Sequence, residues 1–260
     1  MSQVLNCKIE NHIAIVELNR PSKMNALSRD MFESLVNTGR ELRNNKDVRC
    51  VVIHGNERAF CAGLDMEMFT NNDGNLTKLR DRTHGLTNLF QETAWVWHDL
   101  DMPVIAAIEG VCFGGGLQLA CGADMRYVHP EAKMSIMEIK WGLVPDMAGT
   151  QLWSRYVKED LLRELSYTGR IFSGTEAMEY GFATRLTETP LEMAMSIAQE
   201  IAGKNPDAIR GNKRLINQQL TSSVATGMLA ESLEQEVIIG SKNQIEAVMA
   251  NFEKREPNFE

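Results

Sequence analysis

Three short and almost uninterrupted apolar runs, separated by longer amphipathic stretches, constrain the fold of this chain most. Residues 13–18, 50–53 and 103–108 are rich in Ile, Val and Ala, and the first two end at the turn signals Asn-Arg-Pro and Gly. Strands that are apolar at successive positions usually lie in sheets that helices cover on both faces. The pattern therefore predicts an α/β fold with buried strands.

The stretches between these runs have the periodicity of helices. Ser28 precedes a segment in which Met31 and Leu35 recur at near-helical spacing, so we expect Ser28 to cap a helix there. A short helix near residues 117–121 and a strand near residues 125–128 continue the alternation. Alternation of strand and helix is typical of a layered α/β core.

Two other segments differ from this pattern. Residues 67–99 begin with the polar run 71–75 and continue with helical spacing, which suggests a lid made of a loop and a helix. After Pro190, apolar residues recur at helical spacing. We therefore divide the chain into a core of residues 1–190 and a helical C-terminal region of residues 191–260.

The charge of the chain excludes several classes of partner. It has 27 Lys and Arg against 35 Asp and Glu, a net charge of −8, so no broad basic surface is expected to bind nucleic acid or an anionic membrane. An anionic ligand would need a local basic pocket. No signal segment or long apolar window is present, and we expect an unprocessed, cytoplasmic protein.

Cysteine and histidine usage argues against disulfides and metal sites. The five cysteines are an odd number at wide spacing, which favours buried, reduced thiols. The five histidines are scattered, and no CxxC or HExxH motif occurs. We expect no structural metal.

Two segments rich in small residues present accessible backbone amides. Gly114-Gly115-Gly116 follows an apolar strand and opens a helix, where free N–H groups favour an anion. Leu119 takes the place of the last glycine of a dinucleotide-binding fingerprint, and no P-loop lysine follows, so a tight turn is the alternative. Residues 59–65 form the second segment. Together they could supply the two donors of an oxyanion hole.

The order, spacing and type of several motifs resemble the crotonase (enoyl-CoA hydratase/isomerase) superfamily over nearly the whole chain. The matching segments are residues 25–27, 60–65, 105–110, 114–116, 142–145, 168–170 and 177–181, together with Glu138. The resemblance implies a crotonase-like spiral of repeated ββα units, with a C-terminal helical region that builds a homotrimer or homohexamer. It also implies an acyl-CoA thioester as substrate, with CoA as part of that substrate and no separate cofactor.

The same resemblance implies roles for individual residues. The oxyanion-hole amides would be those of Ala62 and Gly115. The residues expected near CoA are Lys23, Ala26, Ala62, Gly63, Leu64 and Asp65. Lys23 could equally be a solvated loop lysine, and Asp65 could simply brace its turn.

The acids depart from the hydratase pattern at one position. Hydratases of the family use two glutamates to hold the attacking water, and the first of these positions is Gln118 here. An amide can hydrogen-bond water but has no useful acid or base pKa, so efficient hydration is in doubt. Glu138 retains the second position and is the best general base. Asp146 stands where dienoyl-CoA isomerases of the family carry an aspartate, and some dehalogenases and hydrolases use an acid near there as a nucleophile.

Other side chains have less specific readings. Five could line an acyl pocket or belong to the ordinary core: Met66, Met68, Phe69, Trp95 and Trp97. Arg20 and Arg58 could meet CoA phosphates or solvent.

We therefore expect an enzyme that stabilises a thioester enolate and shifts a C=C bond in an enoyl- or dienoyl-CoA. The alternatives are a hydratase with weakened hydration, a hydrolase-like or dehalogenase-like enzyme that uses Asp146, and a catalytically silent CoA-binding module.

Overall fold

The computed structural model describes residues 4–56, 58–70, 78–219 and 221–260. Within these ranges, no helix combines the length and the apolar character that crossing a lipid bilayer requires. The predicted polar run 71–75 and the side chain of Phe69 lie outside what the structure describes.

A six-stranded sheet forms the centre of the molecule, in the strand order β1-β2-β3-β5-β7-β10. Its strands are β1 (Leu5–Glu10), β2 (Ile13–Leu18), β3 (Cys50–His54), β5 (Val104–Ile108), β7 (Met125–Val128) and β10 (Arg185–Leu186). The β1–β2 pair is antiparallel, and every other neighbouring pair is parallel. The strands predicted from the three apolar runs and from residues 125–128 are therefore confirmed, as is the α/β class.

A second sheet has the order β4-β6-β8-β9, with the strands β4 (Ala59–Cys61), β6 (Val111–Phe113), β8 (Lys133–Ser135) and β9 (Phe172–Ser173). Consecutive strands alternate between the two sheets: β3, β5 and β7 belong to the first, and β4, β6 and β8 directly follow them in the second. Helical segments follow each such pair. This is the predicted spiral of ββα units.

The helices begin and end as follows: η1 (Pro21–Lys23), α1 (Arg29–Arg43), α2 (Glu67–Thr70), α3 (Leu89–His98), α4 (Gly115–Cys121), η2 (Glu138–Trp141), α5 (Gly149–Trp153), α6 (Glu159–Thr168), α7 (Gly174–Tyr180), α8 (Pro190–Ala202), α9 (Pro206–Gln218), α10 (Val224–Ile238) and α11 (Lys242–Glu253). The predicted cap is confirmed, because the Ser28 side chain accepts a hydrogen bond from the Met31 amide at 3.3 Å.

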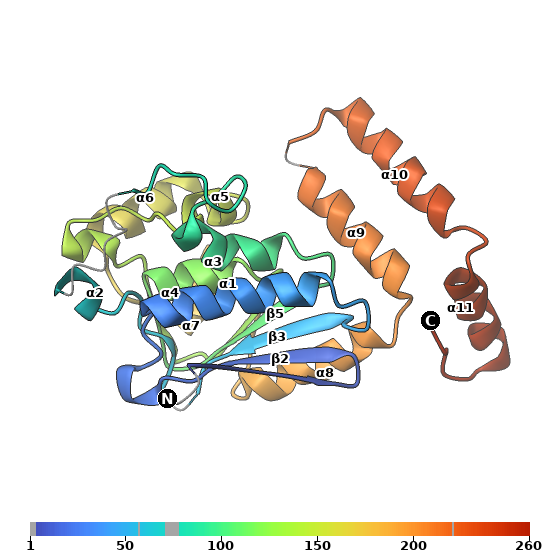
Figure 1. Ribbon diagram of the computed structural model, residues 1–260, viewed down its shortest axis with the longest axis horizontal. Helices are drawn as coiled ribbons and strands as arrows, with labels where there is room; N and C mark the ends of the chain where they lie inside the picture. The colour runs from blue at the N-terminus through green and yellow to red at the C-terminus, as the bar shows by residue number, and fades with distance from the viewer. Residues whose placement is uncertain (1–3, 57, 71–77, 220) are drawn as a thin grey trace.

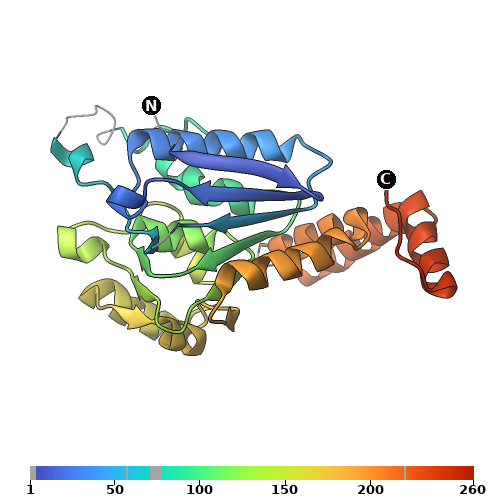
Figure 2. The ribbon, with the colours of Figure 1, turned by 90° about the horizontal axis from the view of Figure 1, so that it is seen from below.

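Helices cover both faces of the six-stranded sheet, which explains why its strands are apolar at successive positions. Alternate residues such as Ile13, Val52 and Ile105 pack against α8, where alanines four residues apart let the helix approach closely. The intervening residues belong to a larger core, which includes side chains of α1, α3 and α4. Figure 2 shows α1 and α8 on opposite sides of the sheet.

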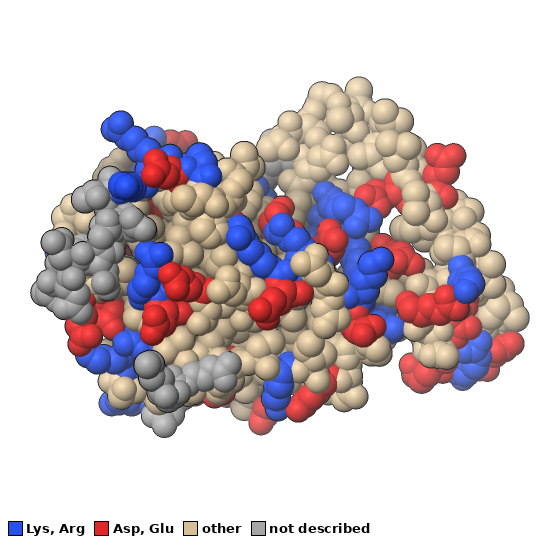
Figure 3. Space-filling model, viewed as in Figure 1, with Lys and Arg blue, Asp and Glu red and all other residues tan. Residues whose placement is uncertain are grey.

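The last three helices form an arm that extends away from the sheets (Figures 1 and 2). No residue of α10 is buried, although the helix carries Leu229, Leu233 and Val237. The upper part of this arm is largely without charged side chains on the face shown in Figure 3. The division of the chain at residue 190 stays a prediction, and α8 itself packs on the sheet.

The cysteines are all free, and four of the five are buried, as expected. Cys7 contradicts the expectation because it is exposed: β1 is an edge strand whose outer positions face solvent.

Candidate active site

Glu138 opens the short helix η2, shortly after strand β8 of the second sheet, and its side chain is almost wholly enclosed. The residue is 9% exposed. Gln118, on α4, is 1% exposed, and its Nε2 donates a hydrogen bond of 2.6 Å to Oε1 of Glu138. The structure therefore joins the two residues that the sequence placed at the two acid positions.

The other end of the Gln118 amide holds a turn. Its Oε1 accepts hydrogen bonds from the backbone amides of Met147 at 2.9 Å and of Gly149 at 3.0 Å. A Cβ on Gly149 would lie 2.7 Å from Gln118 Oε1, so only glycine allows this approach. Asp146 belongs to the same turn, so Gln118 links the segments that carry both candidate acids.

The second carboxylate oxygen of Glu138 has a different environment. Oε2 is buried and has no hydrogen-bond partner among the described residues. The carboxyl group lies over Gly114, where a Cβ would be 3.5 Å from Oε1 and 3.9 Å from Oε2. A buried, unpartnered carboxylate oxygen is costly, which is typical of a group that meets a substrate.

Burial and a neighbouring charge raise the pKa of Glu138. Loss of solvent is the main cause, the Asp146 carboxylate adds to it, and the hydrogen bond from Gln118 opposes it. Crowding by protein atoms also raises the pKa of Asp146. The Asp146 side chain keeps contact with solvent, so we regard its desolvation as weaker than that of Glu138. The site thus combines two carboxyl groups close enough to influence each other.

The two glycine-rich segments come together beside these acids. Gly63 has a φ of 89°, and a Cβ there would lie 2.8 Å from the Phe113 carbonyl oxygen and 3.6 Å from the Gly115 nitrogen. A Cβ on Gly116 would lie 2.4 Å from the Cys61 carbonyl oxygen. The end of β4 and the start of α4 therefore touch through backbone atoms, as the two-donor hypothesis requires.

The structure contradicts the choice of Ala62 as one of the two donors. Its amide already donates a hydrogen bond of 2.9 Å to the Met24 carbonyl oxygen. The carbonyl of Gly63 accepts from the Leu27 amide, so in the planar trans peptide the Leu64 N–H points to the opposite side. Within the described part of the chain, the Leu64 amide donates no hydrogen bond. The Gly115 amide, in the first turn of α4, has no partner within the helix.

Comparisons with known proteins decide the family. The sequence profile described as enoyl-CoA hydratase/isomerase matches residues 8–260. The chain belongs to the enoyl-CoA hydratase/isomerase family.

The proteins that this family member resembles carry names of more than one activity. YngF of Bacillus subtilis is 35% identical over 249 residues, which cover 94% of this chain and 93% of YngF. The peroxisomal Delta(3,5)-Delta(2,4)-dienoyl-CoA isomerase of Arabidopsis thaliana is 29% identical, with coverage of 99% and 96%. The crystal structure of an enoyl-CoA hydratase from Bacillus anthracis has a TM-score of 0.90 at 30% identity, with 99% of each chain covered.

In this hydratase/isomerase family member, several residues expected near CoA have structural partners. Arg20 donates to the Ala26 carbonyl oxygen and, at 2.8 Å, to the Asp65 carboxylate, and so ties together the two turns. This agrees with the bracing role considered for Asp65. Lys23 pairs with Glu67 at 2.7 Å on an exposed surface. Contact of these residues with CoA stays a prediction.

The side chains considered for an acyl pocket lie in different environments. Trp97 and Met68 are buried in the main core, Trp95 packs against that core, and Met66 is 44% exposed. The side chain of Arg58 is exposed. Ordinary core packing therefore accounts for Trp97 and Met68.

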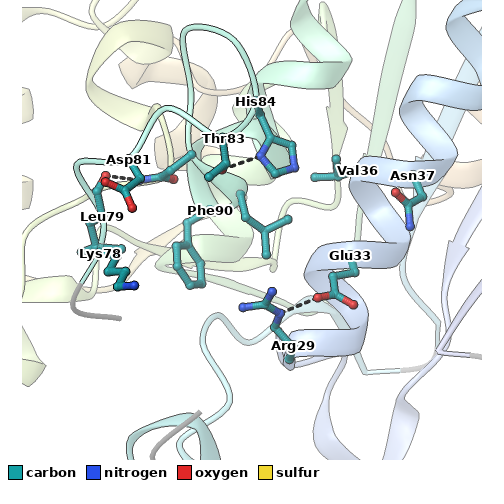
Figure 4. A pocket seen from close by; sticks show the side chains of 12 residues that line it. Arg29, Glu33, Val36, Asn37, Lys78, Leu79, Asp81, Thr83, His84 and Phe90 are labelled. Atoms are coloured by element: carbon teal, nitrogen blue, oxygen red, sulfur yellow. Dashed lines mark hydrogen bonds and ion pairs between the residues drawn. The ribbon is translucent and has the colours of Figure 1, made fainter. Parts of the chain in front are cut away.

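A separate cavity of about 330 Å³ lies between α1 and residues 78–90 (Figure 4). Arg29 and Glu33 from α1 face Phe90 and His84 across it. Neither Glu138 nor Gln118 lines this cavity, so it is distinct from the carboxyl site.

Sequence reasoning did not identify three backbone groups that the structure places at this site: the amides of Leu64, Met147 and Gly149. Peptide geometry is the same for different residue types, so the sequence does not reveal which backbone amide will be free. For Gly149, the glycine itself was the available clue.

Proposed function

We propose that this family member shifts a C=C bond in an acyl-CoA thioester, as an enoyl- or dienoyl-CoA isomerase. The amides of Leu64 and Gly115 would hold the thioester oxygen as negative charge develops on it. Glu138 would remove a proton from the carbon next to the carbonyl and return it further along the chain.

The observation that carries this proposal is the full engagement of Gln118. Its carbonyl oxygen is occupied by two backbone amides, and its nitrogen donates to Glu138. A side chain that is 1% exposed and already bonded at both ends is poorly suited to holding and activating a water. Addition of water therefore lacks a second carboxylate at this position.

A second candidate is a reaction that uses both carboxyl groups. The Asp146 carboxylate acts on Glu138 strongly enough to raise its pKa, so the two lie within electrostatic reach. That arrangement suits proton removal by one group and return by the other in a dienoyl-CoA. It also leaves open the use of Asp146 as a nucleophile in a hydrolase-like or dehalogenase-like reaction.

Turnover on a panel of thioesters tests these proposals. The panel contains 3-enoyl-, 3,5-dienoyl-, 2-enoyl- and haloacyl-CoAs, with the matching free acids as binding controls. Isomerisation faster than hydration by a wide margin supports the proposal. Hydration of a 2-enoyl-CoA as the fastest reaction overturns it, and no turnover on any of them favours a silent CoA-binding module.

We also propose that the protein works as a homotrimer or homohexamer in the cytoplasm. The support is the arm, whose apolar side chains are exposed in the single chain: Val224 75%, Leu229 60%, Leu233 54%, Val237 79% and Phe252 80%. Apolar surface of this kind usually marks a contact with another protein surface.

A further inference from the structure

Gln118 has one permitted orientation in its site. Both Met147 and Gly149 present backbone N–H groups to one end of the amide, at 2.9 and 3.0 Å. Backbone N–H groups can only donate, so that end must be the carbonyl oxygen. The NH₂ end must therefore face Glu138, where it donates at 2.6 Å.

This orientation makes the two oxygens of Glu138 unequal. Oε1 always accepts a hydrogen bond from the Gln118 amide. A proton on Oε1 would therefore compete with the Gln118 N–H group for the same oxygen. Oε2 is buried and without a partner in the described residues, and is free to take a proton from a bound substrate.

We propose that Gln118 is a positioning residue that confines proton transfer to Oε2 of Glu138 and holds the Asp146 turn in place. This inference rests on the proposed isomerisation and deepens it, because it names the atom that transfers the proton. The glutamine is then a fixed clamp and has no role in activating water.

The reaction balances without any further reactant. In a 3-enoyl thioester, the C2–H bond breaks, its proton moves to Oε2, and its electron pair enters the conjugated dienolate. The O–H bond then breaks and a C4–H bond forms, so the double bond that began between C3 and C4 ends between C2 and C3. Because Oε2 is buried, the proton returns before it exchanges with water.

Burial, one neighbouring charge and several hydrogen bonds govern the ionisation of Glu138. Burial raises its pKa most and the Asp146 carboxylate raises it further, whereas the Gln118 donor and backbone N–H groups lower it. Removing the Gln118 donor therefore takes away part of the opposition to the two raising effects. Glu138 would then hold its proton to higher pH, so a smaller fraction of the enzyme would carry the ionised base at a given pH.

The first experiment needs no substrate. The Glu138 carboxyl is titrated by carbon-13 NMR in wild-type protein, in Gln118→Leu and in Gln118→Glu. We expect the pKa to rise by about one unit in Gln118→Leu, as loss of a hydrogen bond to a charged group requires. Gln118→Glu keeps an acceptor for both backbone amides and adds a like charge, so we expect a larger rise. An unchanged pKa in both variants overturns the inference.

The second experiment uses a 3-enoyl-CoA deuterated at C2. Wild-type enzyme should deliver most of the deuterium to C4, and complete exchange with solvent overturns transfer through the buried oxygen. Gln118→Leu should lower kcat at least about tenfold with KM little changed, because the clamp acts on the base and leaves binding alone. The matched control Gln199→Leu, on the exposed face of α8, should match wild type in both respects.

The two readouts separate this inference from the proposed function. If wild-type enzyme fails to isomerise but the Glu138 pKa rises in Gln118→Leu, isomerisation is wrong and the clamp stands. If isomerisation proceeds but Gln118→Leu changes neither the Glu138 pKa nor kcat, the positioning role of Gln118 is wrong and the proposed function stands. Thermal unfolding confirms that each variant is folded.

Discussion

The Lys213 ammonium of α9 lies 2.8 Å from the Asp124 carboxylate, and the lysine is 7% exposed. Its Nζ also donates to the carbonyl oxygens of Met102 at 3.0 Å and Trp97 at 3.3 Å. Asp124 in turn accepts from the amide of Val104, at the start of β5. One buried cation therefore fastens the C-terminal arm to the central sheet.

Replacing this lysine should loosen the arm. Lys213→Met leaves the Asp124 carboxylate and two carbonyl oxygens without their partner, and we expect a loss of about 3 kcal/mol in the free energy of unfolding. Lys204→Met is the matched control: Lys204 is 59% exposed and lies 3.8 Å from Glu200, so its loss should cost almost nothing. Chemical denaturation measures both, and equal effects would contradict the anchoring role of Lys213.

The two acids should respond differently to amide substitution. Glu138→Gln removes the proton carrier while keeping size, and should lower kcat for isomerisation by roughly 10²–10⁴-fold. Asp146→Asn removes a charge that raises the pKa of Glu138, so the acid limb of the pH–rate profile should move to lower pH. If Glu138→Gln instead stays near wild type while Asp146→Asn is inactive, the chemistry belongs to Asp146.

His98 should make the protein less stable in mild acid. Burial and the nearby Arg155 charge lower its pKa from 6.5 to about 4, and Arg155 Nη1 lies 3.0 Å from its Nε2. Below pH 6.5 His98 binds a proton in the unfolded chain but not in the folded protein. Stability therefore falls as the pH drops from 6.5 to about 4. The fall attributable to His98 should approach about 3 kcal/mol and then stop.

Two variants check this pH dependence by denaturation between pH 7 and pH 4. His98→Gln keeps an acceptor for Arg155 and should flatten the dependence. His12→Asn changes an exposed histidine at a position with a φ of 66°, which asparagine tolerates, and should keep the wild-type slope.

Glycine replacements should separate close backbone contact from simple helix propensity. In Gly116→Ala the new methyl would lie 2.4 Å from the Cys61 carbonyl oxygen, so β4 and α4 must part. We expect a cost of about 1–3 kcal/mol or more, together with loss of activity. Gly227→Ala, in open space on α10, should stabilise the protein by about 1 kcal/mol. Thermal unfolding that ranks the two variants in the opposite order would refute the contact.

Assembly should depend on the arm. Light scattering should give a mass of three or six chains of 29.2 kDa, and Val237→Glu should shift it toward the monomer because it places a charge on the apolar face. Ile9→Glu, at an apolar residue that is 46% exposed on the edge strand β1, serves as the control. A wild-type monomer at micromolar concentration would rule out the proposed oligomer.

The sequence was most informative where local chemistry dictates structure. Continuous apolar runs predicted β2, β3 and β5, and a serine cap predicted the start of α1. Strands of two or three residues, such as β9 and β10, are too short to show a period.

The errors and omissions concern relations between distant parts of the chain. Ala62 was the wrong donor because the direction of each peptide plane decides which amide of a turn is free. The Lys213 anchor was not predicted, since one lysine on an amphipathic helix carries no signal of its distant partner. The clamp by Gln118 depends on amides of Met147 and Gly149, which no side-chain pattern reveals.

The packing of α8 has a consequence for synthesis of the chain on the ribosome. The face of the sheet formed by Ile13, Val52, Ile105 and Tyr127 is in place once β7 has emerged, but residues 190–202 that cover it come much later. During that interval the nascent chain exposes an apolar face of the sheet, and such a surface tends to aggregate with other incompletely folded chains. Slowing translation between these two points should therefore increase co-translational aggregation or chaperone engagement, whereas slowing it after residue 202 should have less effect.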